Sequence, residues 1–173
     1  MSRNKIVIAR AIAPTWWICA LWLLAAEIGQ ATIAHYVSVR GVPPSLVLVT
    51  VIWYAIRVDS RRAALFGLAA GLIQDILAQN TGGAWTLSTT FAALAVSLAS
   101  RGFFADSIPL VASITLATTL VTMFAFWIVM GLQGFPGGLA MLHFHEAIIE
   151  ALYNAVVMVF VMLVARRFDS RYA

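Results

Sequence analysis

Residues 108–130 read IPLVASITLATTLVTMFAFWIVM, and no charged side chain interrupts this run. A transmembrane helix needs about 20 mostly apolar residues to cross the hydrocarbon core of a bilayer. This run meets the requirement, and further apolar runs occur on both sides of it, from Ile12 to Ala165. The hydrophobicity therefore extends over the whole chain and is not confined to one targeting segment.

The composition excludes a soluble domain that carries a membrane anchor. Of the 173 residues, 62% are hydrophobic and 10% are charged, whereas soluble domains carry about a quarter charged residues. Backbone polar groups in a bilayer need internal partners, and the runs lack the alternation typical of barrel strands. The sequence therefore predicts an all-α integral membrane protein, with residues 1–173 forming a single polytopic domain.

Six apolar runs are candidate membrane spans, and turn or charge signals separate them. The runs cover residues 12–36, 42–56, 63–78, 84–100, 108–130 and 147–165. The second and third are shorter than the usual length of a span, so each must borrow flanking residues, thin the bilayer or be partly re-entrant. We expect about six spans, and five is the alternative.

The positive charges favour six spans and set the orientation. With six spans, one side of the membrane carries Arg3, Lys5, Arg10, Arg57, Arg61, Arg62, Arg101, Arg166, Arg167 and Arg171. Only Arg40 falls on the other side, and five spans would divide the larger group. Cytoplasmic loops carry the excess of Lys and Arg, so both termini are expected in the cytoplasm of a bacterial inner-membrane protein. The basic residues sit at the ends of runs, which indicates topology and not binding of nucleic acid.

Two carboxylates lie inside predicted spans, where ionisable groups are costly and are functional candidates. Glu27 is within the first run, and a hydrogen-bonded structural role and a role in transport or partner contact are equally open for it. Asp75 ends a series with Ala63, Gly67 and Gly71 at a spacing of four, which places them on one helix face. The small residues allow close approach of another helix, so we expect a packing seam that ends in a polar group.

The other polar residues of the spans suggest contacts between helices. Glu150 and Asn154 are four residues apart in the last run, and threonines 115, 118, 119 and 122 form a stripe on the fifth. His143, His145 and Glu146 precede Glu150 in what we expect to be a loop, but their spacing matches no established zinc motif. We predict no metal site, no cofactor and no catalytic set.

Three stretches resemble one family. They are Pro44, Ser45 and Leu46 at the start of the second run, GLAAGLIQDILAQNTGGAWTL from Gly67 to Leu87, which includes Gly83, and EALYNAVVMVFVMLVARRF from Glu150 to Phe168. Together they resemble the rod shape-determining protein MreD of bacteria over nearly the whole chain. Asn154 matches the polar position of the family's last helix, whereas Glu27, His143 and His145 match no family position.

The resemblance implies a non-enzymatic scaffold of the cell-elongation machinery. Members of the family act beside the periplasmic protein MreC, the filament protein MreB, directly or indirectly, and the synthase RodA with its penicillin-binding transpeptidase. The loops at 57–62 and 101–107 would then touch filament components or anionic membrane lipid. The family's fold is also similar to the substrate-binding subunits of energy-coupling-factor transporters.

That similarity defines a rival prediction, a transport subunit that binds a small ligand near the external side. Its candidate ligand-binding residues are Glu27, Asp75, Trp85, His143 and Glu150. A binding pocket requires such groups to converge, which the sequence does not show. A third alternative, an enzyme acting on lipid through the carboxylates of Glu27 and Asp75, ranks last.

Overall fold

The computed structural model describes residues 15–79, 81–100 and 107–168, and these residues form six α-helices with no β-strand. The helices are α1 (Trp16–Thr32), α2 (Leu46–Ala55), α3 (Ser60–Ala78), α4 (Ala84–Ala99), α5 (Ile108–Leu132) and α6 (Gly137–Phe168). The prediction of an all-helical chain is therefore confirmed for the described residues. Arg3, Lys5, Arg10, Arg101 and Arg171, which the charge argument used, lie outside them.

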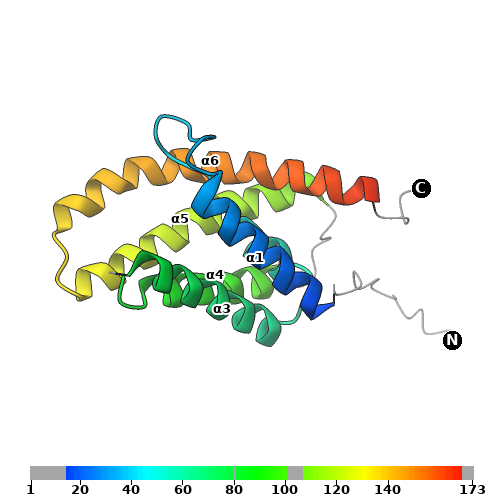
Figure 1. The fold of residues 1–173 in the computed structure, drawn as a ribbon, viewed down its shortest axis with the longest axis horizontal. Helices are drawn as coiled ribbons and strands as arrows, with labels where there is room; N and C mark the ends of the chain where they lie inside the picture. The colour runs from blue at the N-terminus through cyan, green and yellow to red at the C-terminus, as the bar shows by residue number, and fades with distance from the viewer. Residues whose placement is uncertain (1–14, 80, 101–106, 169–173) are drawn as a thin grey trace, which may run out of the picture.

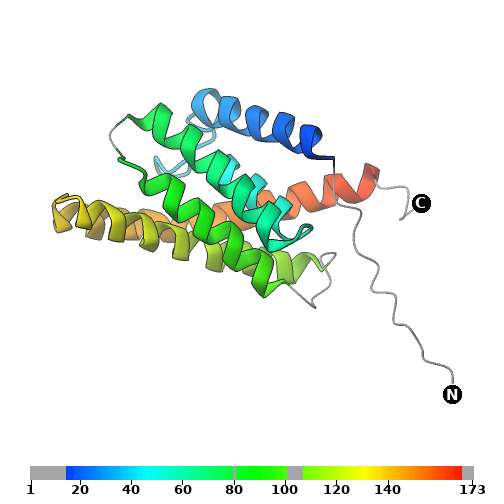
Figure 2. The same cartoon turned by 90° about the horizontal axis from the view of Figure 1, so that it is seen from below.

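Successive helices run in alternating directions along one bundle (Figures 1 and 2). The start of α1 and the end of α6 lie at the same end of this bundle. The closest pairs are α3 with α4 and α5 with α6, and each pair is joined by a short connection. The connections after α1, α3 and α5 consequently lie toward the opposite end, and the one after α5 projects furthest (Figure 1).

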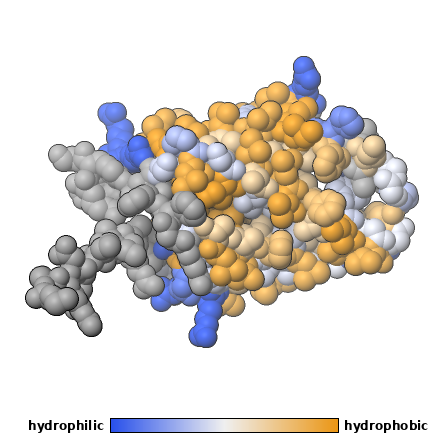
Figure 3. Space-filling view, turned by 180° about the vertical axis from the view of Figure 1, so that it is seen from behind, coloured by the Kyte–Doolittle hydropathy of each residue, from blue (hydrophilic) through white to orange (hydrophobic). Residues whose placement is uncertain are grey.

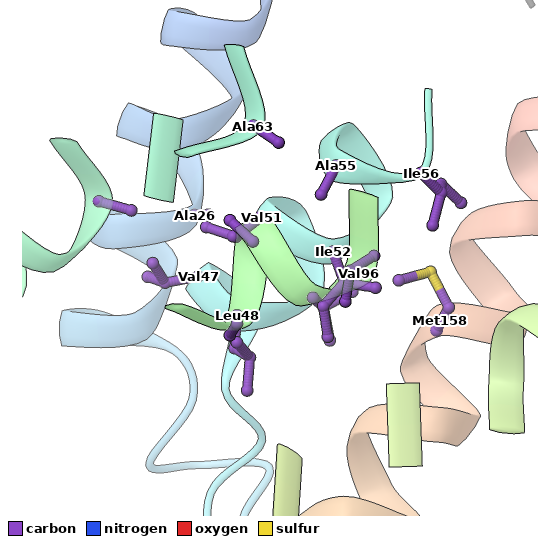
Figure 4. Packing of buried hydrophobic residues seen from close by; sticks show 14 of the residues in the cluster. Ala26, Val47, Leu48, Val51, Ile52, Ala55, Ile56, Ala63, Val96 and Met158 are labelled. Atoms are coloured by element: carbon purple, nitrogen blue, oxygen red, sulfur yellow. The ribbon is translucent and has the colours of Figure 1, made fainter. Parts of the chain in front are cut away.

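The short helix α2 occupies the middle of the bundle, where it contacts each of the other five helices. Seven of its ten residues are buried, and its Val47, Val51 and Ile52 are completely enclosed. Figure 4 shows Ile52 beside Val96 of α4 and Met158 of α6, and all of these side chains belong to one buried hydrophobic cluster. At 1.5 Å per residue α2 is only about 15 Å long, half the thickness of a bilayer core. Its ends therefore lie within the protein, where buried irregular backbone is tolerated.

The outer surface of the bundle is largely apolar. Figure 3 shows hydrophobic residues across the middle of one face and hydrophilic residues near its two ends. Large side chains such as Trp22, Ile76, Phe124 and Phe160 are each more than half exposed. A soluble protein rarely exposes a continuous apolar surface of this size. Two helical segments, Ile108–Leu132 and His143–Arg167, are also long and apolar enough to cross a membrane, as expected of a membrane protein.

The helices differ from the predicted runs mainly at α6. We expected a loop up to residue 146, but α6 begins at Gly137 and continues through His143 and His145 to Phe168. At 32 residues it is about 48 Å long, more than a bilayer core requires. The prediction was wrong because the two histidines and the glycines lower the local hydropathy without interrupting the helix. Hydropathy locates the part of a helix that suits lipid, and the helix itself can extend further.

Candidate functional site

Gly67 and Gly71 lie where α3 approaches α4 most closely. A Cβ atom on Gly67 would stand 2.6 Å from the carbonyl oxygen of Thr89, and one on Gly71 would overlap the hydroxyl of Thr89 and stand 2.5 Å from the Cα of Thr86. The Thr89 hydroxyl donates to the carbonyl oxygen of Gly67 at 2.8 Å. Both glycines therefore serve contact between two helices of the same chain.

The carboxylate of Asp75 binds the first turn of α4. It accepts hydrogen bonds from the backbone N–H groups of Trp85 (3.1 Å) and Thr86 (2.8 Å), and from the hydroxyls of Thr81 (2.6 Å) and Thr86 (2.5 Å). The N-cap residue of α4 is Gly83, whose φ of +90° suits glycine and which has no side chain to cap the helix. Asp75 supplies the missing acceptor from another helix, where a negative charge also favours the helix dipole.

The first turn of α2 is capped in the same way by side chains from other helices. Asn154 Oδ1 accepts from the N–H of Ser45 at 2.8 Å, and Gln30 Oε1 accepts from the N–H of Leu46 at 2.7 Å. Asn154 also donates to the Thr119 hydroxyl at 3.3 Å, and it is completely buried. A helix that starts inside a membrane protein leaves N–H groups that water cannot reach. Asn154 and Gln30 satisfy two of them, next to the buried ring of Pro44.

The threonine stripe of α5 is mostly satisfied within its own helix. The hydroxyls of Thr115, Thr119 and Thr122 donate to carbonyl oxygens four residues earlier, at 2.7–2.9 Å. All three side chains are completely buried. The stripe therefore supplies small, satisfied polar groups to the interior, and Thr119 alone among these three also accepts the bond from Asn154 described above.

A cavity of about 660 Å³ lies at the end of the bundle where α1, α3 and α5 finish. Its polar lining comes from Glu27 and Gln30 of α1, Gln74 of α3, and His143, Glu146 and Glu150 of α6. Its apolar lining includes the aromatic side chains of Trp85, Phe126, Trp127 and Phe135. A volume of this size lies within the range of small-molecule sites. The first helix and the start of the last helix therefore contribute carboxylates to one space.

Glu27 and Glu150 differ in their partners within this cavity. Glu27 is 4% exposed, and its Oε1 has no hydrogen-bond partner among the described residues. Glu150 Oε1 is 3.5 Å from the amide nitrogen of Asn154, which makes a weak contact. A buried carboxyl oxygen without a partner is costly, so the fold leaves Glu27 Oε1 available to a group from outside the chain.

His143 pairs with Glu146, and His145 does not join them. His143 Nδ1 lies 2.7 Å from Glu146 Oε2, and its ring stacks on Trp127 with 5.1 Å between centroids. His145 Nδ1 instead lies 3.4 Å from the carbonyl oxygen of Met141 in its own helix. Within the described part of the chain, no three His, Cys, Asp or Glu side chains are grouped as metal ligands.

The profile of a known family matches almost the entire chain. The family is described as rod shape-determining protein MreD, and the match covers residues 10–168. The chain belongs to the MreD family. It therefore has a role in rod shape determination, and the family assignment made from sequence motifs is confirmed. No curated protein and no solved structure matches the chain, so similarity to energy-coupling-factor subunits stays a prediction.

The structure of this MreD chain shows which of the polar residues singled out in the sequence lie in the same place and which do not. Asp75 holds α4, and Glu27 lines the cavity, so the carboxylates proposed as a pair for lipid chemistry serve different places. Trp85, His143 and Glu150 do line the same cavity as Glu27. Sequence reasoning missed Gln30, although an amide inside an apolar run, three residues after Glu27, was a signal for it.

Proposed function

We propose that this MreD protein is a non-enzymatic membrane scaffold that links MreC, MreB and the RodA synthase with its penicillin-binding transpeptidase during cell elongation. The family match over residues 10–168 carries the proposal. The geometry supports it, because Asp75 and Asn154 use their polar atoms to hold helices of the same chain together. Such groups build a rigid platform and are not free to act on a substrate.

The proposed scaffold crosses the bacterial inner membrane six times and has both termini in the cytoplasm. The alternating directions of the six helices support an even number of crossings (Figure 1). Arg57, Arg61 and Arg62 near the start of α3 and Arg166 and Arg167 near the end of α6 lie toward the same end of the bundle. Clustered cations at that end agree with a cytoplasmic location and with contact to anionic lipid.

The test is affinity purification of the tagged protein from its native host in a gentle detergent, followed by identification of the proteins recovered with it. We expect MreC and RodA. Gly71→Leu should abolish their recovery, because its side chain would collide with the backbone of α4 and separate α3 from α4. Gly131→Leu is the matched control, since a Cβ at Gly131 meets nothing within 4 Å, and it should recover both partners.

The cavity gives the rival transport function a concrete basis, and the same purification separates the two. Recovery of a pair of ATPases with a coupling subunit, in place of MreC and RodA, would move the assignment to a substrate-binding transport subunit. Recovery of MreC and RodA with Gly71→Leu as efficiently as with the wild type would contradict the role assigned to the α3–α4 contact.

A further inference from the structure

The cavity described above contains two acceptor atoms that the fold does not satisfy. Glu27 Oε1 and Gln74 Oε1 are both buried, and neither has a hydrogen-bond partner in the described part of the chain. Both residues line the cavity, from α1 and α3. Two unsatisfied acceptors that share one cavity require a donor from outside, because each otherwise keeps the cost of its lost hydration.

The charges of the lining indicate the sign of that donor. Three carboxylates line the cavity, and the lining holds no Lys or Arg among the described residues. His143 lies against Glu146 at 2.7 Å, which leaves Glu27 and Glu150 without a cationic neighbour in the lining. An anionic ligand would meet repulsion here, whereas a cation would supply the opposite charge that an ionised carboxylate needs inside a membrane.

The aromatic residues of the lining also favour a cationic ligand. Trp85 and Phe126 have ring centroids 4.4 Å apart, Phe126 and Trp127 are 5.6 Å apart, and Trp127 stacks on His143. These four rings form a continuous row along the cavity lining. The faces of aromatic rings attract ammonium groups and also accept apolar groups. The row therefore suits a ligand with a cationic group next to an apolar part.

We propose that this cavity binds a ligand that carries a protonated primary amine beside an apolar or aromatic group. The ammonium group has three donors and no acceptor, which suits a lining that offers unsatisfied oxygens at Glu27 and Gln74 and carries carboxylates without Lys or Arg among the described residues. The apolar part lies against the row of Trp85, Phe126 and Trp127. A free small amine and an aminophospholipid both carry an ammonium group, and in the phospholipid the acyl chains supply the apolar part.

The test measures calorimetric binding of three matched probes to the purified full-length protein. The probes are 2-phenylethylammonium, 2-phenylethanol and phenylacetate, which have similar aromatic parts and differ in charge. We expect saturable binding of the ammonium probe, about tenfold tighter than the alcohol, because a charge-assisted hydrogen bond is replaced by a neutral one. Phenylacetate should not bind. Equal binding of ammonium and alcohol, or none of either, would overturn the proposal.

Two isosteric variants locate the binding. Glu27→Gln and Glu150→Gln each remove one charge from the cavity and preserve side-chain size. We expect Glu27→Gln to lower the affinity for the ammonium probe about tenfold. Asp59→Asn is the control, since Asp59 caps α3 outside the cavity lining and asparagine caps equally well. Should Glu27→Gln fail to fold, Glu150→Gln and the comparison of probes still decide. Wild-type affinity in both variants would overturn the site.

Binding experiments in nanodiscs distinguish a free amine from a lipid as the source of the ammonium group. Phosphatidylethanolamine added to phosphatidylglycerol discs will compete with the ammonium probe if the cavity takes a lipid headgroup, and it will leave the probe's affinity unchanged if the cavity takes a free amine. The proposal does not rest on the scaffold function. Recovery of MreC and RodA with Glu27→Gln separates the two, because that recovery tests the scaffold and the calorimetry tests the cavity.

Discussion

At the scale of single residues, the polar groups of the spans fall into two classes. Asp75 and Asn154 bind backbone N–H groups at the starts of α4 and α2, at 2.8–3.1 Å. Glu27 is more deeply buried than Asp75, yet its Oε1 has no partner in the described chain. The sequence predicts that all three are unusual, but it does not reveal that Asp75 and Asn154 bind the starts of helices whereas Glu27 Oε1 has no partner in the described chain.

Removal of the Asp75 carboxylate should loosen the start of α4. Asp75→Ala leaves the N–H groups of Trp85 and Thr86 without their acceptor, and we expect a loss of about 1–2 kcal/mol of stability, as for other helix caps. Asp75→Asn keeps one accepting oxygen and should lose less. Thermal unfolding in detergent measures both. Wild-type stability of Asp75→Ala would contradict the capping role.

The stability of the protein should depend more on the side-chain oxygen of Asn154 than on its amide nitrogen. Asn154→Leu leaves the buried N–H of Ser45 unsatisfied, which costs about 1–3 kcal/mol. Asn154→Asp retains an acceptor for Ser45, although it loses the amide donor to Thr119 and to Glu150 and places a second carboxyl beside Glu150. The midpoint of thermal unfolding should therefore fall more for leucine than for aspartate, and the reverse order would show that the bond to Thr119 matters more.

At the scale of elements, the contact between α3 and α4 depends on the absence of two side chains. Gly71→Ala adds only a Cβ, but this atom would lie 2.5–2.6 Å from backbone atoms of α4 that cannot move independently. Overpacking of this kind costs about 1–3 kcal/mol. Gly131→Ala gains the same helix propensity, up to about 1 kcal/mol, in open space. Unfolding midpoints should fall for the first variant and stay equal or rise for the second.

The sequence predicts the helices well where hydropathy and helix ends coincide. The fourth run was expected at 84–100 and α4 covers Ala84–Ala99, and α5 begins at residue 108 as predicted. The prediction fails at α6 because the glycines at 137 and 138 and the histidines at 143 and 145 lower the local hydropathy without ending the helix. It also cannot reveal that α2 is the central helix, since burial by protein and burial by lipid select the same apolar side chains.

At the scale of the whole molecule, the cavity is the feature that sequence could not supply. Glu27 and Glu150 are separated by most of the chain, and no periodicity links them. They line the same cavity because the end of α1 and the start of α6 lie at the same end of the bundle, around the segment that precedes α2. The sequence identifies each residue as costly inside a membrane, but their convergence depends on the tertiary packing of all six helices.

The proposed topology can be tested by the accessibility of single cysteines, because Cys19 is the only native one. In a Cys19→Ser background, Tyr36→Cys lies between α1 and α2 at a position that is 86% exposed, and Arg61→Cys lies on the exposed surface at the start of α3. A membrane-impermeant maleimide should label Tyr36→Cys in spheroplasts. It should label Arg61→Cys only after lysis, because Arg61 belongs to the basic set expected in the cytoplasm.

This pair of positions tests the weakest step of the topology, since α2 alone separates them and is about 15 Å long. If the segment around α2 crosses the membrane, the bilayer thins locally or the flanking residues complete the span, and the two cysteines are labelled from opposite sides. If it is re-entrant, both are labelled from one side and the number of crossings becomes five. Five crossings would place Arg3, Lys5 and Arg10, which precede α1 in the sequence, on the opposite side from the cations near α3 and at the end of α6, which the positive-inside rule disfavours. We therefore expect labelling from opposite sides.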